Sequence, residues 1–333
     1  MEKQEKRALT ISQIKEIVIF GSTYLIVALI NLRVKLKLTP AWFNGRLEKN
    51  HEQLLAFQYS NNEQSRLFQF LIPEALKQCF GISIINAYIL QRWLLVFVTL
   101  LCFHFYLKRW FDTRLAFTGV LFLAVIMPLT FKNDLQESTP LLLLTFLLAL
   151  WAIREHHTVW YMLVISLGAL NNETVLILPL VFLFYNFEDF RLKSLIKLAW
   201  ITLVSSLPAY VIVGTIRYIT RESPRLAPLW QWDNNLKGIL KQIGAFPWDA
   251  TYFFVFFIFG FFWLYAFLGY SRQPLFLKRA ALMVPFFVLA HFLGGMINEV
   301  RLMLPLSFVI IPMALLYLFP PKDSEEVREA TDN

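Results

Sequence analysis

Ten apolar runs separated by short polar connections limit what this chain can fold into. The runs lie near 17–32, 84–107, 115–131, 139–153, 159–170, 174–187, 196–216, 251–270, 280–297 and 302–319. About 20 apolar residues are enough for a helix to cross a bilayer, and a lipid-exposed backbone must satisfy its own hydrogen bonds. We therefore expect an all-α polytopic membrane protein with about ten transmembrane helices.

The composition supports this class and excludes others. Hydrophobic residues make up 57% of the 333 residues and charged residues only 16%, whereas soluble domains carry about 25% charged residues. The two cysteines, Cys79 and Cys102, are too far apart along the expected helices to suggest a disulfide framework. The net charge of +8 comes from basic clusters between apolar runs, which is not the single basic face of a nucleic-acid-binding protein.

The positions of Lys and Arg in the short connections predict the orientation of the chain. One set of connections holds Lys108, Arg109, Arg114, Arg154, Arg191, Lys193, Lys197, Arg272, Lys278 and Arg279. The short loops of the other set hold only Lys132 and Arg301. Because cytoplasmic loops carry the excess of basic residues, we expect both termini in the cytoplasm and the second set of loops outside.

The same pattern predicts the domain organisation: one membrane domain over 1–319 and a polar cytoplasmic tail over 320–333. The first run lacks a small-residue cleavage site after it, so we interpret it as an uncleaved anchor. Two outer loops are longer than the rest. Residues 33–83 contain amphipathic helical patterns suited to a membrane surface, and residues 217–250 contain Trp230, Trp232 and Trp248, which are typical interfacial anchors.

Ionisable side chains beside or within apolar runs are costly and therefore mark candidate sites. The candidates for binding a ligand gather towards the outer side and are Arg66, Arg92, Glu173, His291, Glu299 and Arg301. Arg92 either lines an outward cavity or pairs with a neighbouring helix, and His291 suits a hydrogen-bonded core position as well as a site.

Two outer turns allow simpler interpretations as well. Asn172 and Glu173 fit the capping position and first turn of a helix, where both residue types are favoured. Glu299 and Arg301 are two residues apart, and such residues do not face each other on a helix. Each of these two side chains would then need another partner.

Three outer carboxylates are candidates for catalysis. Glu48 and Glu52 lie four residues apart, on one face of a helix, with His51 beside them. Asp134 lies in another outer loop. Such a carboxylate acts as a general base on an acceptor hydroxyl or binds a divalent cation, and the alternative is the solvated face of a surface helix.

The order of several segments resembles a known family. These segments are "SRLFQFLIPEALKQCFGISIINAYILQRW", "KNDLQES", "GALNNETVLILPLVF" and "GGMINEVRLMLPLSFVIIPMAL". Together they are similar to bacterial multi-span glycosyltransferases of the GT-C superfamily, without a large soluble C-terminal domain. The matching elements are Arg66 with Pro73, Asn172 with Glu173 and Thr174, and Glu299 with Arg301 and Pro305.

The resemblance implies a function. Family members transfer a sugar from a polyprenyl-phosphate carrier to a glycan, lipid or protein on the outer side of the membrane, and use an Asp or Glu of the first loop. It implies a bacterial cytoplasmic membrane with the active face outward. This sequence has Asn50-His51-Glu52 where the family usually has an Asp, so Glu52 becomes the expected base, assisted by Glu48 or Asp134.

Three hypotheses remain open at the level of the sequence. In the first, a glycosyltransferase, Arg66, Arg92 and Arg301 hold the donor phosphate and the Trp-rich loop covers the sugar. The second is a transporter or flippase of a lipid-linked anion, which predicts charge at the membrane midplane and access from both sides. The third is a non-catalytic assembly partner that kept the fold and lost the acid.

Overall fold

Helices account for the regular structure of this chain. A computed structural model describes residues 11–38, 40, 45–59, 62–129, 138–221, 230–244, 258–297 and 299–320, and no strand occurs among these residues. The α-helices are α1 (Ile11–Leu38), α2 (Arg46–Leu55), α3 (Leu67–Phe80), α4 (Ile84–Leu107), α5 (Thr113–Leu129), α6 (Ser138–Arg154), α7 (Thr158–Ala169), α8 (Leu178–Tyr185), α9 (Leu192–Ile219), α10 (Trp232–Gly244), α12 (Phe262–Leu268), α13 (Leu275–Ala281), α14 (Met283–Gly294) and α15 (Ser307–Leu318). Short 3₁₀ segments are η2 (Asn62–Ser65), η3 (Glu173–Ile177), η4 (Tyr270–Arg272) and η5 (Val300–Leu306).

Five helical segments of the described chain are long and apolar enough to cross a membrane. They are Ile14–Leu38, Ile84–Leu107, Leu192–Ile219, Leu275–Gly294 and Val300–Leu318. Four shorter apolar helical segments are Thr113–Pro128, Ser138–Arg154, Thr158–Ala169 and Glu173–Tyr185. Every predicted run overlaps one of these segments except 251–270, which is described only from residue 258. The prediction of a helical membrane protein agrees with this structure, and the number of spans stays a prediction.

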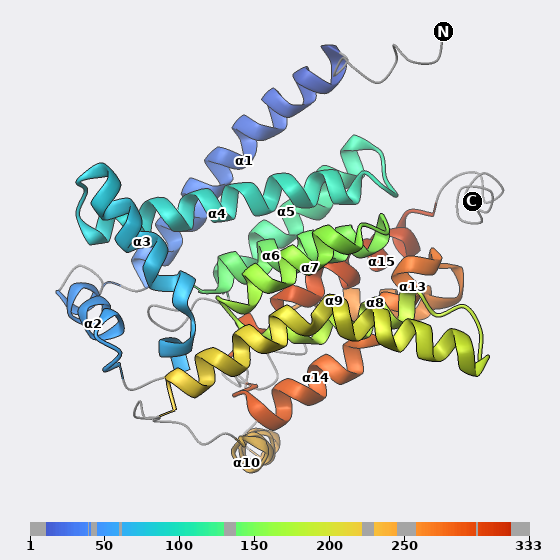
Figure 1. Ribbon diagram of the computed structural model, residues 1–333. Coiled ribbons are helices and arrows are strands. Elements are labelled where there is room, and N and C mark those ends of the chain that lie inside the picture. Colours follow the sequence, from blue (N-terminus) through green and yellow to red (C-terminus); the bar gives the residue numbers. More distant parts are fainter. Residues whose placement is uncertain are drawn as a thin grey trace, which may run out of the picture.

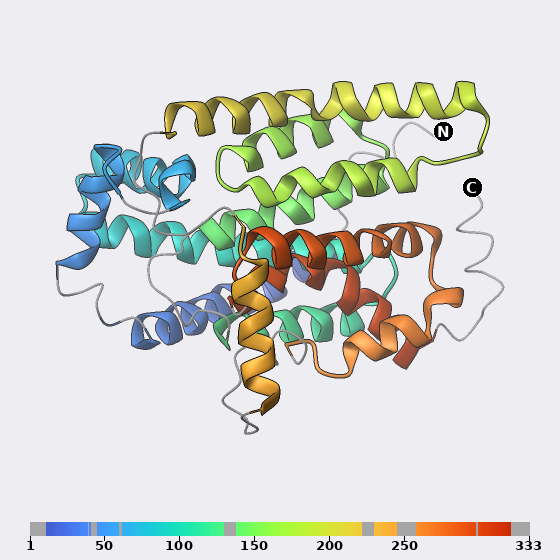
Figure 2. The ribbon, with the colours of Figure 1, turned by 90° about the horizontal axis from the view of Figure 1, so that it is seen from below.

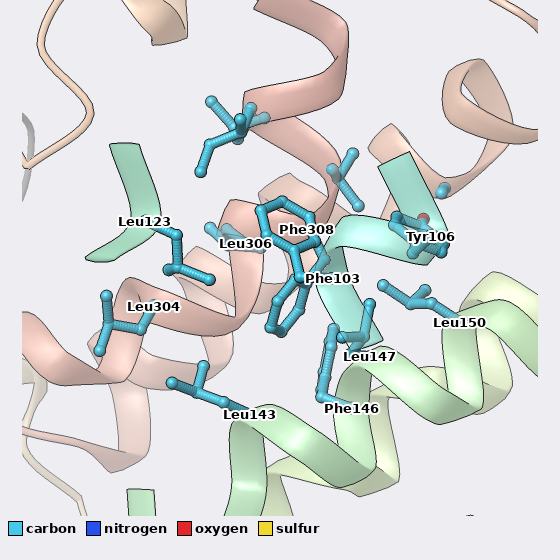
Figure 3. Packing of buried hydrophobic residues seen from close by; sticks show 14 of the residues in the cluster. Phe103, Tyr106, Leu123, Leu143, Phe146, Leu147, Leu150, Leu304, Leu306 and Phe308 are labelled. Atoms are coloured by element: carbon cyan, nitrogen blue, oxygen red, sulfur yellow. The ribbon is translucent and has the colours of Figure 1, made fainter. Parts of the chain in front are cut away.

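Burial separates central helices from peripheral ones. The segment Val300–Leu318 is 89% buried and the segment Leu192–Ile219 only 17%, so α15 forms the centre of the bundle and α9 its rim. Side chains from α4, α6 and α15 fill the interior, including Phe103, Phe146 and Phe308 (Figure 3). The Phe103 and Phe308 rings meet edge to face with centroids 5.1 Å apart. The apolar surface of α9 is left facing outward, as expected for a helix in lipid.

The connections fall into two groups in space, as the charge distribution predicts. The connections α4–α5, α6–α7, α8–α9 and α12–α13 lie at one end of the bundle (Figure 1). The ten basic residues of the sequence pattern lie in or beside these connections. The end of α9, the α7–η3 turn and α3 lie at the other end (Figure 1). The side of the membrane on which each end lies stays a prediction.

Helix α1 is tied into the bundle by a buried polar network. The Glu16 carboxylate accepts hydrogen bonds from Lys108 Nζ at 2.6 Å and from Thr113 Oγ1 at 3.1 Å. His104 lies 3.1 Å from the same carboxylate through Nε2 and 2.7 Å from the Tyr24 hydroxyl through Nδ1. The first apolar run is therefore an integral helix of the fold, extending to Leu38 beyond the predicted end near residue 32.

Candidate functional site

A cavity of about 590 Å³ opens at the end of the bundle opposite the basic connections. It lies between η2, η3, the last turns of α9 and α14, and the start of η5. Its polar lining residues are Glu63, Ser65, Arg66, Asn172, Glu173, Thr174, Arg217, Gln231, His291, Glu299 and Arg301. The cavity thus brings together five of the six predicted binding residues, from segments far apart in the sequence.

Arg301 is a buried charged residue of the cavity lining. Its side chain is 6% exposed and its Nη2 donates to Glu299 Oε2 at 2.5 Å. A longer contact of 3.4 Å joins Nη1 to the Thr139 hydroxyl on α6. Within the described part of the chain Nε has no hydrogen-bond partner. A buried donor without a partner is costly, and this nitrogen is such an unsatisfied donor on a residue that lines the cavity.

The pairing of Glu299 with Arg301 corrects the sequence prediction that these two side chains need separate partners. That prediction assumed α-helical geometry across both residues. Glu299 instead has φ −80° and ψ 82°, outside the helical region, and the 3₁₀ segment η5 begins only at Val300. The non-helical backbone at Glu299 lets its carboxylate turn back to the guanidinium two residues later.

Glu63 and Arg66 line the cavity from the segment between α2 and α3. Arg66 precedes α3 with a non-helical backbone, and its buried Nη1 has no hydrogen-bond partner among the described residues. Glu63 is 5% exposed, and burial raises its pKa to about 7, although Arg66, Arg301 and a hydrogen bond from Gln69 act in the opposite direction. A carboxyl group of this kind exchanges its proton near neutral pH, which suits a general base.

The mouth of the cavity carries an ion pair between two helix ends. Arg217, in the last turn of α9, donates through Nε to Glu173 Oε2 at 2.9 Å, and both side chains are well exposed. Glu173 opens η3, where Asn172 accepts a hydrogen bond from the Thr174 backbone N–H at 3.0 Å. The predicted capping role of Asn172 is confirmed, and Glu173 also faces the cavity.

His291 is both a hydrogen-bonded helix residue and a cavity residue. Its Nδ1 lies 2.9 Å from the Phe287 carbonyl oxygen. A carbonyl only accepts hydrogen bonds, so Nδ1 carries the hydrogen in this contact. In the neutral ring Nε2 is then the acceptor, and it lies 3.5 Å from the Thr174 hydroxyl at the cavity wall.

Apolar side chains also line the cavity. From η3, α8 and α9 these are Leu176, Ile177, Leu180, Val213 and Ile216, together with the ring of Tyr210. Helix α9 lies at the rim of the bundle, with large apolar side chains on its outer surface. The lining of the cavity therefore combines arginine and glutamate side chains with apolar side chains, some of them from a helix at the rim of the bundle.

The carboxylates predicted from the first loop lie elsewhere. Helix α2 buries Leu47, Asn50, His51 and Leu54 on one face. Glu52 lies outside this face and is exposed, and the half-buried Glu48 has one oxygen without a partner in the described structure. Neither side chain lines the cavity, and Asp134 lies outside the described residues.

His51 instead fastens α2 to its neighbours. Its Nε2 lies 2.9 Å from Glu74 Oε2 on α3, and its Nδ1 lies 3.0 Å from the Tyr88 hydroxyl on α4. The His51 hydrogen bond is the largest effect on Glu74 and, with one from Gln78, lowers its pKa to about 2. This part of the first outer loop is therefore a structural clamp between three helices.

The structure also locates the remaining residues that the sequence analysis discussed. Arg92 is 1% exposed within α4 and does not line the cavity. Cys79 and Cys102 are free thiols. Among the described residues no three His, Cys, Asp or Glu side chains gather as ligands for a metal ion.

Sequence reasoning did not select four polar residues of the cavity as candidate site residues: Glu63, Ser65, Arg217 and Gln231. Glu63 sits in a polar loop where an exposed glutamate is ordinary, and Arg217 ends an apolar run where a snorkelling arginine is ordinary. The only available signal for Glu63 was its spacing of three residues from Arg66.

Comparison with known proteins adds no assignment, because the sequence matches no protein-family profile and shows no significant similarity to a curated protein.

Proposed function

We propose that this protein is a membrane glycosyltransferase that moves a sugar from a polyprenyl-phosphate carrier to an acceptor outside the cytoplasm. The observation that carries the proposal is the mixed lining of the cavity, which combines arginines and glutamates with apolar side chains. The arginines complement an anionic head group, and the apolar side chains of η3, α8 and α9 complement a hydrocarbon chain. A carrier-linked sugar phosphate has both parts.

The arginines supply the phosphate site in this proposal. Arg301 and Arg66 each present a buried nitrogen without a partner in the described structure, and both line the cavity. A guanidinium binds phosphate oxygens in a fixed fork and stays charged when buried. Its charge stabilises the carrier phosphate as the bond to the sugar breaks.

Glu63 is the general base in this proposal. It lines the same cavity as the arginines, and its raised pKa allows it to accept a proton near neutral pH. The acceptor hydroxyl gives its proton to the Glu63 carboxylate as its oxygen attacks the sugar, and the carrier phosphate leaves. The exposed Glu52, at the position implied by the family resemblance, is the alternative base.

A transporter of the same anion is the second candidate, and the packing favours the enzyme over it. Leu304 and Leu306 lie three and five residues after Arg301, and they pack in the interior with Leu143, Leu147 and further apolar side chains (Figure 3). Transport past these close-packed side chains would require the central helices to separate. Such a close-packed core suits a reaction at one membrane face.

The test is a transfer assay with the purified protein in lipid nanodiscs and polyprenyl-phosphate sugars as donors. Glu63→Gln keeps the shape of the side chain but removes the base, so we expect transfer to fall by about 10²–10⁴-fold. Donor binding should persist, because the arginines remain. The matched control is Glu52→Gln, which should keep wild-type transfer.

Reversed results for the two variants would assign the base to Glu52. Donor binding by the wild-type protein without any transfer would contradict the enzyme and favour the non-catalytic partner.

A further inference from the structure

Helix α10 has three distinct faces along its length. Gln231, just before the helix, and Asn235 are buried. Trp232, Leu236 and Leu240 form an apolar stripe four residues apart and are 49%, 41% and 59% exposed. Asp233 and Lys237 lie on a third face and form an ion pair with an N–O distance of 2.5 Å. An ordinary surface helix needs only two faces, one buried and one polar.

The buried face fixes α10 against the end of α14. Asn235 Nδ2 donates to the carbonyl oxygens of Phe292 and Gly295, each at 2.7 Å, and Asn235 Oδ1 accepts from the Ile297 N–H at 3.0 Å. The Gln231 N–H donates to the Leu293 carbonyl oxygen at 2.7 Å. These four hydrogen bonds hold the buried face of α10 against the end of α14, so the fold sets the direction in which the apolar stripe points.

The orientation of α10 relative to the long apolar helices indicates what the apolar stripe contacts. Helix α10 is seen end-on in Figure 1 and along its length in Figure 2, so it runs across the direction of α9 and α14. A helix perpendicular to the membrane spans lies in the plane of the bilayer. Helix α14, on which α10 docks, itself exposes the apolar side chains Phe286 and Leu289, as a helix in contact with lipid does.

We infer that α10 lies in the interface of the bilayer, with Trp232, Leu236 and Leu240 among the lipid head groups and upper acyl chains. Interfacial helices place an apolar face about 5–10 Å into this region and keep charged residues on the water side. Since Gln231 lines the cavity, this position places the cavity mouth at head-group depth. The inference does not depend on sugar transfer, because it concerns only the position of α10.

The test is site-directed spin labelling of the full chain in nanodiscs, with Cys79 and Cys102 replaced by serine. Single labels are placed through Asn235→Cys, Leu236→Cys, Lys237→Cys and Leu240→Cys, and the exposed Trp200→Cys on α9 is the reference for a label in lipid. We expect labels at 236 and 240 to collide with oxygen, which concentrates in lipid. The label at 237 should collide with a water-soluble nickel chelate, and the label at 235 with neither.

Three results would overturn the inference. Equal nickel access at 236 and 237 would place the stripe in water. Shielding of 236 and 240 from both probes would show a protein or a second copy of this chain on the stripe. A depth far beyond about 10 Å below the phosphates would exclude an interfacial position. If the Asn235→Cys chain does not fold, the other three labels still decide between these results.

Discussion

At the scale of single residues, Glu63 is subject to two opposing effects: burial favours its neutral form, and the proposed catalysis requires its ionised form. Burial raises its pKa to about 7 in the folded protein, above the usual 4.5. Its neutral form is therefore favoured by folding, and this contribution to stability is full below pH 4.5 and is lost as the pH rises through about 7. The proposed base is the ionised form. The reaction thus needs the ionised carboxylate, whereas folding favours the neutral carboxyl group. Perturbed pKa values of this kind are common at functional sites.

The raised pKa predicts the pH dependence of the proposed transfer. The rate should rise with pH up to about 7 and then level off, because only the carboxylate accepts the proton. The Glu63→Gln protein should lose this rise of the rate with pH, whereas the Glu52→Gln protein should keep it. Rates measured between pH 5 and 9 decide the matter, and an unchanged rise in Glu63→Gln would show that another group titrates.

Arg301→Lys tests the phosphate site. Lysine keeps the positive charge but cannot hold Glu299 and a phosphate with one planar fork. The loss of a charge-assisted hydrogen bond of about 1.5–3 kcal/mol predicts polyprenyl-phosphate affinity lower by about tenfold or more. Arg272→Lys, an exposed position in η4 at the other end of the bundle, is the matched control. Equal affinity in both variants would leave Arg301 with a structural role only.

At the scale of elements, helix α2 shows why the candidate base moved from Glu52 to Glu63. The positions Leu47, Asn50, His51 and Leu54 form the buried face, and the sequence pattern of α2 is compatible with this face. The hydrogen-bond partners of His51 lie 23 and 37 residues away, so local spacing could not distinguish a clamp from a catalytic group. The apolar helices were predictable because periodicity and length are local properties.

The clamp predicts acid sensitivity of this region. The pKa of Glu74 falls from 4.5 to about 2 on folding, so its carboxylate stabilises the protein above pH 4.5, and this contribution is lost as the pH falls from 4.5 to about 2. Glu74→Gln should lower the melting temperature at pH 7 by about 2–4 °C and show a smaller further loss in acid than the wild type. Glu52→Gln is the control and should melt like the wild type. Identical acid dependence in Glu74→Gln and the wild type would refute the clamp.

At the scale of the whole molecule, the charge pattern of the sequence predicted which connections lie together, and the structure groups them at one end. The cavity could not be predicted in the same way. Its walls come from η2, η3, α9, α14 and η5, and only the packing of the bundle decides that Glu63 and Arg217 meet in it. Residues of the Asn172 and Glu299 motifs were found because they interrupt apolar runs.

The orientation is open to a direct test. In a chain without native cysteines, Lys237→Cys should react with a membrane-impermeant thiol reagent in intact cells, because it lies on the polar face of α10. Arg114→Cys, exposed beside the α4–α5 connection, should react only after the membrane is broken. Reaction at Arg114→Cys alone would place the cavity on the cytoplasmic side and contradict an outward-facing transferase.

The Glu16 network also governs how this protein is made. Helix α1 leaves the ribosome long before α4 and α5, so the Glu16 carboxylate waits for Lys108 and Thr113 while 92 and 97 further residues are synthesised. Until then an acidic side chain near the start of an apolar helix has no basic partner from these helices. We therefore expect α1 to reach its final packing only after α4 and α5 have been made, and a chain that ends before Lys108 to lack this attachment of α1.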